Sequence, residues 1–473
     1  MTQGLSYAKQ RSTFVALPGV ARPQHSAADI RHAITFAEAK TRSHNELTKT
    51  RAGTSNALVE GEQGAPFRAP WLATAANSFS VASVSGLAVV IAAAPLVIGL
   101  YAYIAYPLLL WAVSAIRTRR LHAYEVRSWP SVTITVPVYN AVSSISATLQ
   151  SILALDYPPD QLEVLVISDG SNDGTDTVVR TFANRGVELL RLPERKGKTS
   201  AENAALAASH GEILVNIDST ILVPADSLKK LVRVFEDPSI GVASGRDVSV
   251  GAVQNDGTLA ESGYVGYEMR VRELETRVGS IVGASGCFYA SRRCIHGKPL
   301  PPALSWDFAA ALIARQQGYR SVSVSDAVCI VPRAAELKTE FRRKARTMAR
   351  GLNTLFYHHG LMNPLRYGSF ALMLISHKLC RWLPYLIAPI AYVALGTLAV
   401  ESAIARVLFA TLTVGLLAGF VGTRRGVSNA WKPLAVAGFF VTVLSAGFTA
   451  WWAVIRQTQI ATWDPTPRPE AQT

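Results

Sequence analysis

A long stretch without charge is the feature that most limits how this chain can fold. From Val81 to Ile116 the sequence contains no Asp, Glu, Lys, Arg or His. A helix needs roughly 20 apolar residues to cross a bilayer, so this stretch is long enough for one crossing but short for two with a turn. We therefore expect one long or tilted transmembrane helix over residues 81–116. The basic cluster that follows it, Arg117, Arg119 and Arg120, is typical of the cytoplasmic side.

Three further apolar runs lie near the C-terminal end, at Leu383–Val400, Val407–Val421 and Leu434–Trp452. They predict three transmembrane helices within residues 383–455, followed by a tail over residues 456–473. Arg424 and Arg425 separate the second run from the third and indicate a cytoplasmic loop. Residues 352–382, which precede these runs, are basic and aromatic, and they predict amphipathic helices at the membrane interface.

The composition agrees with a membrane protein. Of 473 residues, 49% are hydrophobic, and the net charge is +14. Lys and Arg side chains next to anionic membrane lipid account for that charge. The sequence has no zinc-finger, recognition-helix or stacking-aromatic pattern, so we expect no nucleic-acid partner. We expect a multi-pass protein of a bacterial-type inner membrane.

Two further features concern the polar parts of the chain. Residues 1–75 are rich in Ala, Ser, Thr, Arg and Gln, and they predict a disordered arm without a cleavable signal peptide. The four cysteines form no Cys-x-x-Cys pair, so neither a zinc site nor a redox motif is indicated.

The region from residue 129 to residue 351 has a different pattern. Short β-branched runs at 132–136, 162–167 and 213–217 alternate with helix-like stretches. Such alternation is typical of parallel βαβ units, and continuous apolar strands fit a sheet that is covered on both faces. We therefore expect a cytoplasmic α/β domain over residues 129–351, with ligands at the carboxyl ends of its strands.

Two groups of polar residues follow the first two of these strands. Pro137, Tyr139 and Asn140 close the first strand, where a nucleotide base could stack on Tyr139; the alternative is an ordinary strand-to-helix turn. Asp169 directly follows the second strand, and its carboxylate suits a uracil N–H or a ribose hydroxyl. Asp173 nearby could instead serve as a turn and helix-capping residue.

Two charged residues come next along the chain. Lys198 opens a helix, where its charge adds to free backbone N–H groups and favours a diphosphate; the alternative is a solvated basic turn. Asp218 ends the third strand. A carboxylate beside a diphosphate suits an oxygen-preferring Mg²⁺ or Mn²⁺, and the alternative is a capping aspartate.

These elements, in this order, resemble family 2 glycosyltransferases over residues 129–351, and the flanking spans resemble the membrane-bound members of the cellulose- and hyaluronan-synthase-like superfamily. The resemblance implies the GT-A fold, with a mixed, mostly parallel sheet, and a nucleotide-sugar donor of the UDP-sugar type. It makes Asp169 the aspartate that binds the base and Lys198 the lysine of the Gly-Lys element. Asp218 matches the first aspartate of the Asp-x-Asp motif. Thr220 stands in place of the second, so a site formed by Asp218 and Thr220 would hold Mg²⁺ or Mn²⁺ more weakly.

The same resemblance assigns roles to residues near the acceptor. Asp307, which precedes a helix ending in Gly318-Tyr319-Arg320, matches the general base, and this role is compatible with capping that helix. Trp306 replaces the usual first acid and could form an apolar platform for a sugar ring. Residues 283–287 resemble the glycine-rich loop near the acceptor, where Gly286 would let a sugar approach the backbone; a plain tight turn is the alternative.

Processive members of the family carry a Gln-x-x-Arg-Trp motif. The matching region, Glu340–Thr347, lacks both the glutamine and the tryptophan. Arg343 and Arg346 could still bind the leaving diphosphate, or they could form a basic cluster that faces lipid. The missing residues favour a non-processive or modified transferase over a standard polymer synthase.

The resemblance implies an inverting enzyme of the EC 2.4 class. It would move a sugar to a lipid-linked or polysaccharide acceptor during exopolysaccharide or cell-envelope glycan synthesis, with other polysaccharide-assembly proteins as candidate partners. A second hypothesis is a catalytically degenerate domain that binds a nucleotide or acts as a partner subunit, since Thr220 departs from the motif. The presence of Asp169, Lys198, Asp218 and Asp307 favours the enzyme.

Overall fold

The computed structural model describes residues 70–116, 126, 128–250, 256–332, 337–425 and 432–458. Most of the expected polar arm and of the C-terminal tail lies outside these residues, as do Arg117, Arg119 and Arg120.

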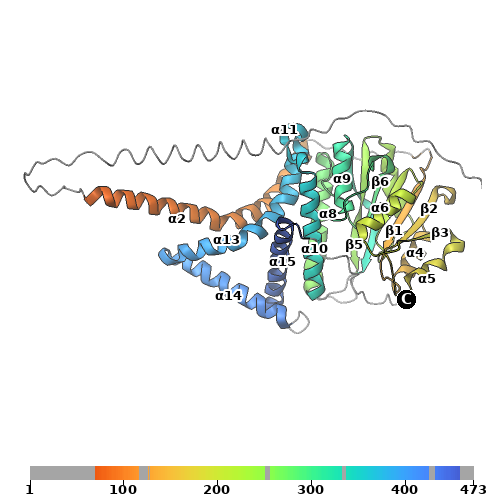
Figure 1. Cartoon of the computed structure of the whole chain (residues 1–473). Coiled ribbons are helices and arrows are strands. Elements are labelled where there is room, and N and C mark those ends of the chain that lie inside the picture. The colour runs from red at the N-terminus through yellow and green to blue at the C-terminus, as the bar shows by residue number, and fades with distance from the viewer. Residues whose placement is uncertain are drawn as a thin grey trace, which may run out of the picture. The chain divides into compact units, whose positions relative to one another are not determined.

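A seven-stranded sheet lies at the centre of the α/β domain, in the order β3-β2-β1-β4-β6-β5-β7 (Figure 1). The strands are β1 (Val132–Val138), β2 (Leu162–Ser168), β3 (Val187–Arg191), β4 (Ile213–Ile217), β5 (Ile240–Val250), β6 (Phe288–Arg292) and β7 (Arg320–Pro332). β6 runs antiparallel to both of its neighbours, whereas the other strand pairs are parallel. The predicted mixed, mostly parallel sheet is confirmed.

Helices connect these strands and cover the sheet. The α-helices of the domain are α4 (Ile145–Leu153), α5 (Thr175–Arg180), α6 (Lys198–Ala208), α7 (Ser227–Val232), α8 (Asp256–Val278), α9 (Trp306–Gln316) and α10 (Leu337–Tyr357). Short 3-10 turns are formed by Pro159–Gln161, Ala183–Arg185, Arg233–Glu236 and Arg293–Ile295.

Burial explains why the apolar runs form strands. Every residue of β1 is buried. Ile134, Val166 and Val215 share the main apolar core, while Leu165 and Ile167 face α6 on the other side of the sheet. A strand that is covered on both faces gains from apolar side chains at every position, which is the continuous pattern seen in the sequence.

The strand register brings several polar residues to one edge of the sheet. Val138, the last residue of β1, pairs with Ser168, the last residue of β2. β4 pairs in parallel with the other side of β1. Tyr139, Asp169 and Asp218, which follow the three strands, therefore emerge at the same edge, where parallel sheets bind their ligands.

Within the described residues, four helical stretches are long and apolar enough to cross a membrane: Ser85–Ile116, Ser369–Glu401, Ala403–Arg424 and Pro433–Ile455. They are built from α2 (Pro70–Leu100), a π-helical turn η1 (Tyr101–Ala105), α3 (Tyr106–Ile116), α12 (Ser369–Leu374), a second π-helical turn η7 (Ile375–Leu379), α13 (Cys380–Glu401), α14 (Ala403–Arg425) and α15 (Lys432–Ile455). A 3-10 turn (His359–Met362) and α11 (Pro364–Tyr367) join α10 to α12. The two π-helical turns meet, because the Tyr101 hydroxyl and the Ser376 hydroxyl are hydrogen-bonded at 2.7 Å.

The second of these stretches begins at Ser369, whereas the sequence pattern placed its start at Leu383. The reason lies in a buried ion cluster formed by Glu268, Glu275, His377 and Arg381. His377 is 1% exposed, and its ring lies between Glu275 Oε1 at 2.6 Å and Glu268 Oε1 at 3.0 Å. Arg381 donates to Glu268 Oε2 at 2.6 Å. These polar residues interrupt the apolar pattern, yet α8 supplies the partners that allow their burial.

The charge balance of this cluster is visible at Glu268, which lies on α8. Burial by itself would raise the pKa of this carboxyl, but the nearby His377 and Lys378 side chains hold the pKa well below its ordinary value. Glu268 is therefore ionised and neutralised by basic residues of the second apolar stretch. The cluster fastens that stretch to the α/β domain.

We predict that α14 tolerates a large side chain at one glycine and not at another. A Cβ atom on Gly419 would lie 2.4 Å from Val441 Cγ2, whereas one on Gly415 has no neighbour within 4 Å. Gly419→Leu should therefore push α15 away and cost about 1–3 kcal/mol of stability. Gly415→Leu is the matched control and should behave like the native protein. The thermal unfolding midpoint of the purified protein in detergent measures both, and equal losses in the two variants would contradict this packing.

Candidate functional site

Lys198 lies at the centre of the candidate site. It is the first residue of α6, after Gly197, whose φ of 91° places it in the left-handed region. The Lys198 ammonium donates to Asp218 Oδ1 at 2.7 Å and to the Gly286 carbonyl at 3.3 Å. Burial opposes the charged form, but the carboxylates around it, Asp218 first, raise the pKa of Lys198. The start of α6, the end of β4 and the loop before β6 therefore meet at one cation.

Asp307 lies beside this group because Gly286 has no side chain. A Cβ atom on Gly286 would stand 3.1 Å from Asp307 Oδ2. Asp307 is the second residue of α9, and its Oδ1 accepts a hydrogen bond from the Ser305 hydroxyl. Its backbone carbonyl accepts from the Ala284 N–H at 3.2 Å, which fixes the glycine-rich loop against α9. The structure thus brings together Lys198, Asp218, Gly286 and Asp307.

Asp169 holds the basic turn that precedes α6. It is 2% exposed, and its two carboxylate oxygens accept from the backbone N–H groups of Lys196 at 2.7 Å and Gly197 at 2.8 Å. Gly170 next to it has a φ of 71°, and a Cβ atom there would lie 3.1 Å from Arg195 N. The carboxylate expected to contact the nucleotide therefore also positions the backbone in front of Lys198.

The residues at the end of β1 form the adjacent part of the edge. The Arg195 guanidinium lies over the Tyr139 ring, with its Cζ 3.8 Å from the ring centroid. Asn140 has a φ of 46° and exchanges two hydrogen bonds with Asn172, both at 2.9 Å. Pro137 is buried within β1. Tyr139 is therefore part of an aromatic and cationic stack, and Asn140 ties the two strand-end loops together.

Asp173 acts locally in this structure. Its carboxylate accepts hydrogen bonds from Thr175 and, at 3.1 Å, from the Val142 N–H. These are the contacts of a turn and capping residue.

The structure buries Trp306. The residue is 4% exposed, its indole N–H donates to Asn203 Oδ1 at 3.1 Å, and its ring packs against His296. A ring covered in this way presents little surface to a sugar.

The oxygen ligands for a cation are few. Asp218 contributes one carboxylate, and Thr220, two residues on, contributes a neutral hydroxyl. No group of three or more His, Cys, Asp or Glu residues that could hold a metal occurs among the residues that the structure describes. A divalent cation here would therefore depend on oxygen atoms of a bound ligand as well.

Arg350 is a residue of this region that the sequence patterns missed. It donates to the Thr199 hydroxyl and to the Leu304 carbonyl, the latter at 2.5 Å. Arg343 and Arg346 are half-buried on the same helix, α10. The spacing of Arg343, Arg346 and Arg350 places all three on one helix face, which is the signal that could have identified the third.

Glu202 was also missed, although it lies four residues after Lys198 on α6. Its Oε1 is 3.8 Å from the Lys198 ammonium, and its side chain is 4% exposed. Its Oε2 is buried without a hydrogen-bond partner among the described residues. Burial, helped by the charges of Asp307 and Asp218, raises the pKa of Glu202 to about 7 against the opposing effect of Lys198 and Arg350.

Comparison with known proteins places this site in a family. The Glycosyl transferase family 2 model matches residues 133–294. The chain is 37% identical over 126 residues to an N-acetylglucosaminyltransferase of Rhizobium meliloti (strain 1021), a match that covers 26% of this chain and 29% of that protein. It is 33% identical over 129 residues to an N-acetylglucosaminyltransferase of Rhizobium leguminosarum bv. trifolii, covering 26% of this chain and 71% of that protein. The chain spans only 27–29% of the length of three such relatives.

A solved structure shows the same fold. A mannosyltransferase from Pyrobaculum calidifontis, in complex with GDP-Man and Mn²⁺, superposes with a TM-score of 0.59 at 24% identity and covers 79% of this chain and 99% of that chain. The α/β domain therefore has the GT-A fold of nucleotide-sugar-dependent transferases. The chain belongs to glycosyltransferase family 2.

We predict that Glu202 makes stability depend on pH. A carboxyl whose pKa is higher in the folded chain than its ordinary value of about 4.3 binds its proton more tightly when folded, so its contribution is largest at low pH and is lost as pH rises through about 7. Glu202→Gln, which imitates the neutral acid, should therefore raise stability at pH 8 by on the order of 2 kcal/mol more than it does at pH 5.

Thermal unfolding midpoints of the two proteins from pH 5 to pH 8 measure this difference. Glu188→Gln, a change at an exposed glutamate of β3, is the control and should leave the pH profile unaltered. A gain from Glu202→Gln that is the same at both pH values would contradict the prediction.

Proposed function

We propose that this protein is an inverting glycosyltransferase, which moves a sugar from a nucleotide-sugar donor to a lipid-linked or polysaccharide acceptor in exopolysaccharide or cell-envelope glycan synthesis. The observation that carries the proposal is the meeting of Lys198, Asp218 and Asp307 around Gly286. The Lys198 ammonium, proposed to bind a diphosphate, and the Asp307 carboxylate, proposed as the base, both lie beside Gly286, which has no side chain. That arrangement suits attack on a sugar held between them.

In the proposed reaction, Asp307 accepts the proton of the acceptor hydroxyl while that oxygen forms a bond to the anomeric carbon. The bond from the anomeric carbon to the donor phosphate oxygen breaks, and its electron pair leaves with the nucleoside diphosphate. Because the attack is in line with the departing group, the anomeric centre is inverted. Lys198 and the backbone N–H groups at the start of α6 stabilise the negative charge on the diphosphate.

Asp169, Pro137, Tyr139 and Asn140 are proposed to bind the nucleoside at the adjoining strand ends. The Arg195 guanidinium, whose Cζ lies 3.8 Å from the Tyr139 ring centroid, supports a role for this ring in binding groups over its face. Arg343 and Arg346 remain proposed contacts of the leaving diphosphate.

We propose a divalent cation, Mg²⁺ or Mn²⁺, as the cofactor. Asp218 is its best protein ligand, Thr220 is a weak one, and the donor diphosphate must supply further oxygens. When bound, the cation would add positive charge that stabilises the leaving diphosphate. The Mn²⁺ in the mannosyltransferase of similar fold supports this assignment.

The donor and the location follow from the relatives and from the apolar helices. Because several relatives are named N-acetylglucosaminyltransferases, we propose UDP-N-acetylglucosamine as the first donor to test. The four apolar stretches support a multi-pass protein of the inner membrane. Arg424 at the end of the third stretch and the basic residues after Ile116 favour a cytoplasmic α/β domain.

We predict that Asp307→Asn abolishes transfer and leaves donor binding largely intact, since the amide cannot accept the proton. Loss of a general base should lower kcat by roughly 10²–10⁴-fold. Release of the nucleoside diphosphate from a panel of nucleotide sugars measures turnover, and equilibrium binding of UDP measures the donor site. Asp160→Asn, at an exposed aspartate, is the control. Turnover retained in Asp307→Asn would exclude this residue as the base.

We predict that Thr220→Asp strengthens the metal site by restoring a second carboxylate. The Mn²⁺ concentration for half-maximal activity should fall roughly tenfold, because affinity rises with the number of charged ligands. Asp218→Asn should have the opposite effect, and Thr181→Asp, at an exposed threonine, should have none. Titration of Mn²⁺ after chelation measures all four proteins. Activity that is insensitive to chelation in every variant would argue against a metal cofactor.

A further inference from the structure

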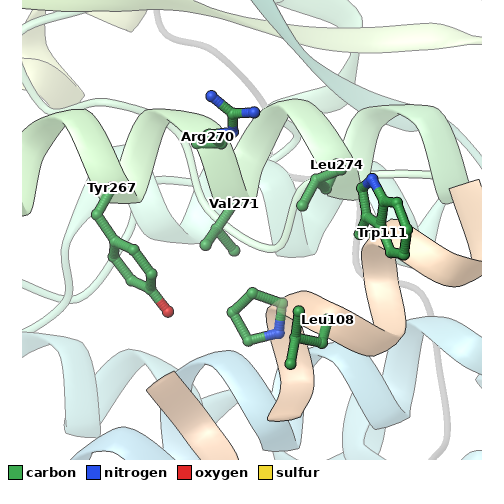
Figure 2. A pocket seen from close by; sticks show the side chains of 7 residues that line it. Leu108, Trp111, Tyr267, Arg270, Val271 and Leu274 are labelled. Carbon is green, nitrogen blue, oxygen red and sulfur yellow. The ribbon is translucent and has the colours of Figure 1, made fainter. Parts of the chain in front are cut away.

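A pocket of about 370 Å³ lies between α3 and α8 and shares no residue with the candidate active site. Its lining residues, shown in Figure 2, are Pro107, Leu108 and Trp111 of α3 and Tyr267, Arg270, Val271 and Leu274 of α8. The walls are mostly apolar, and Arg270 is the one charged residue among those that line it. One wall thus belongs to the first apolar stretch and the other to the α/β domain.

Two hydrogen bonds fix the width of this pocket. The Tyr267 hydroxyl donates to the Tyr103 carbonyl at 2.9 Å, and the Tyr106 hydroxyl donates to Glu275 Oε1 at 2.6 Å. Tyr267 and Glu275 lie at either end of the part of α8 that lines the pocket. Because both ends are fastened to the first apolar stretch, the pocket is a preformed gap between two tied helices.

The position of the pocket along the first apolar stretch sets its depth in a bilayer. Ser85–Ile116 has 32 residues, whereas roughly 20 are enough to cross the hydrocarbon core. The stretch is therefore longer than one crossing needs. α8 bears the exposed ion pair of Glu273 and Arg277 and packs against β7, so it lies outside the hydrocarbon. The segment of α3 beside α8 therefore lies at the level of the lipid headgroups.

A ligand in this pocket, at the level of the lipid headgroups, would contact both the apolar walls and the cation of Arg270. Figure 2 shows the Arg270 side chain leaving α8 with its guanidinium directed away from Leu108. Arg270 is exposed and lines the pocket, so its charge can reach the polar layer beside the apolar walls. Trp111, 64% exposed, is the type of residue that anchors helices at the interface. Apolar contact together with a cation suits a lipid that carries a phosphate.

We propose that this pocket binds an anionic phospholipid of the surrounding bilayer, with its upper acyl carbons against the apolar walls and its phosphate on Arg270. The lipid comes from the bilayer because α3 belongs to the apolar stretch Ser85–Ile116. The net charge of +14 favours an anionic headgroup. The proposal rests on the insertion of α2 and α3 in a membrane, which is part of the proposed function, and not on the transfer reaction.

The site has a route to the catalytic residues. Val271 of the pocket lies in one buried apolar cluster with Val282 and Phe308. Phe308 directly follows Asp307, and Val282 directly precedes the glycine-rich loop. A lipid that fills the pocket supports the far side of this cluster. We expect transfer in vesicles that contain phosphatidylglycerol to be roughly fivefold faster than in phosphatidylcholine alone.

Lipid retention tests the proposal directly. The full chain is purified in detergent, mixed with phosphatidylglycerol and examined by native mass spectrometry, which counts the bound lipid. The native protein should retain phosphatidylglycerol. Leu274→Trp, which fills the pocket, should abolish that retention, and Arg270→Gln should weaken it about fivefold. Arg277→Gln, at an exposed arginine of the same helix outside the pocket, is the matched control and should retain lipid as the native protein does.

Three outcomes would overturn the proposal. They are unchanged retention in both Leu274→Trp and Arg270→Gln, an equal loss in Arg277→Gln, and retention of a polyprenyl phosphate in preference to phosphatidylglycerol. Monodisperse elution and UDP binding show that each variant is folded. Failure of the transferase assignment would appear as native protein without turnover on any nucleotide sugar, and it would leave the lipid count unaffected.

Discussion

The contact between the Lys198 ammonium and the Asp218 carboxylate, 2.7 Å long, is the interaction on which the candidate site depends. It joins the start of α6 to the end of β4, and the same ammonium reaches the Gly286 carbonyl. Asp169 secures the turn in front of Lys198 through two backbone N–H groups. Three segments that are distant in sequence are thereby held around one cation.

Helix α10 connects this site to the apolar helices. On one face, Arg350 donates to Thr199 in the first turn of α6. On the same face, the Thr354 hydroxyl accepts at 2.9 Å from the N–H of Ser305, which directly precedes α9. On another face, Leu352 packs with Trp451 of α15 in a buried cluster. A displacement of α15 would therefore be transmitted through α10 to the starts of both α6 and α9.

The sequence was sufficient for the sheet, because β-branched runs reveal buried strands and strand ends converge on one edge. The family resemblance, rather than the strand pattern, pointed to Gly286 and Asp307 as neighbours of Lys198 and Asp218. The sequence did not reveal residues whose meaning depends on distant partners. His377 looked interfacial because its partner Glu275 lies 102 residues away on α8. The contacts of Arg350 and Glu202 and the burial of Trp306 could not be predicted for the same reason. Propensity and spacing describe a single segment, whereas the burial of a side chain depends on other segments that pack against it.

The two π-helical turns, Tyr101–Ala105 and Ile375–Leu379, change which side chains of their helices face the rest of the protein. Each holds one residue more than an α-helical turn, and an extra residue rotates everything beyond it by about 100°. The stripe facing the protein before the turn is therefore out of phase with the stripe after it. Deleting one residue from either π-helical turn would rotate α3 or α13 about its own axis. Tyr106 or Arg381 would then point away from the carboxylates of α8.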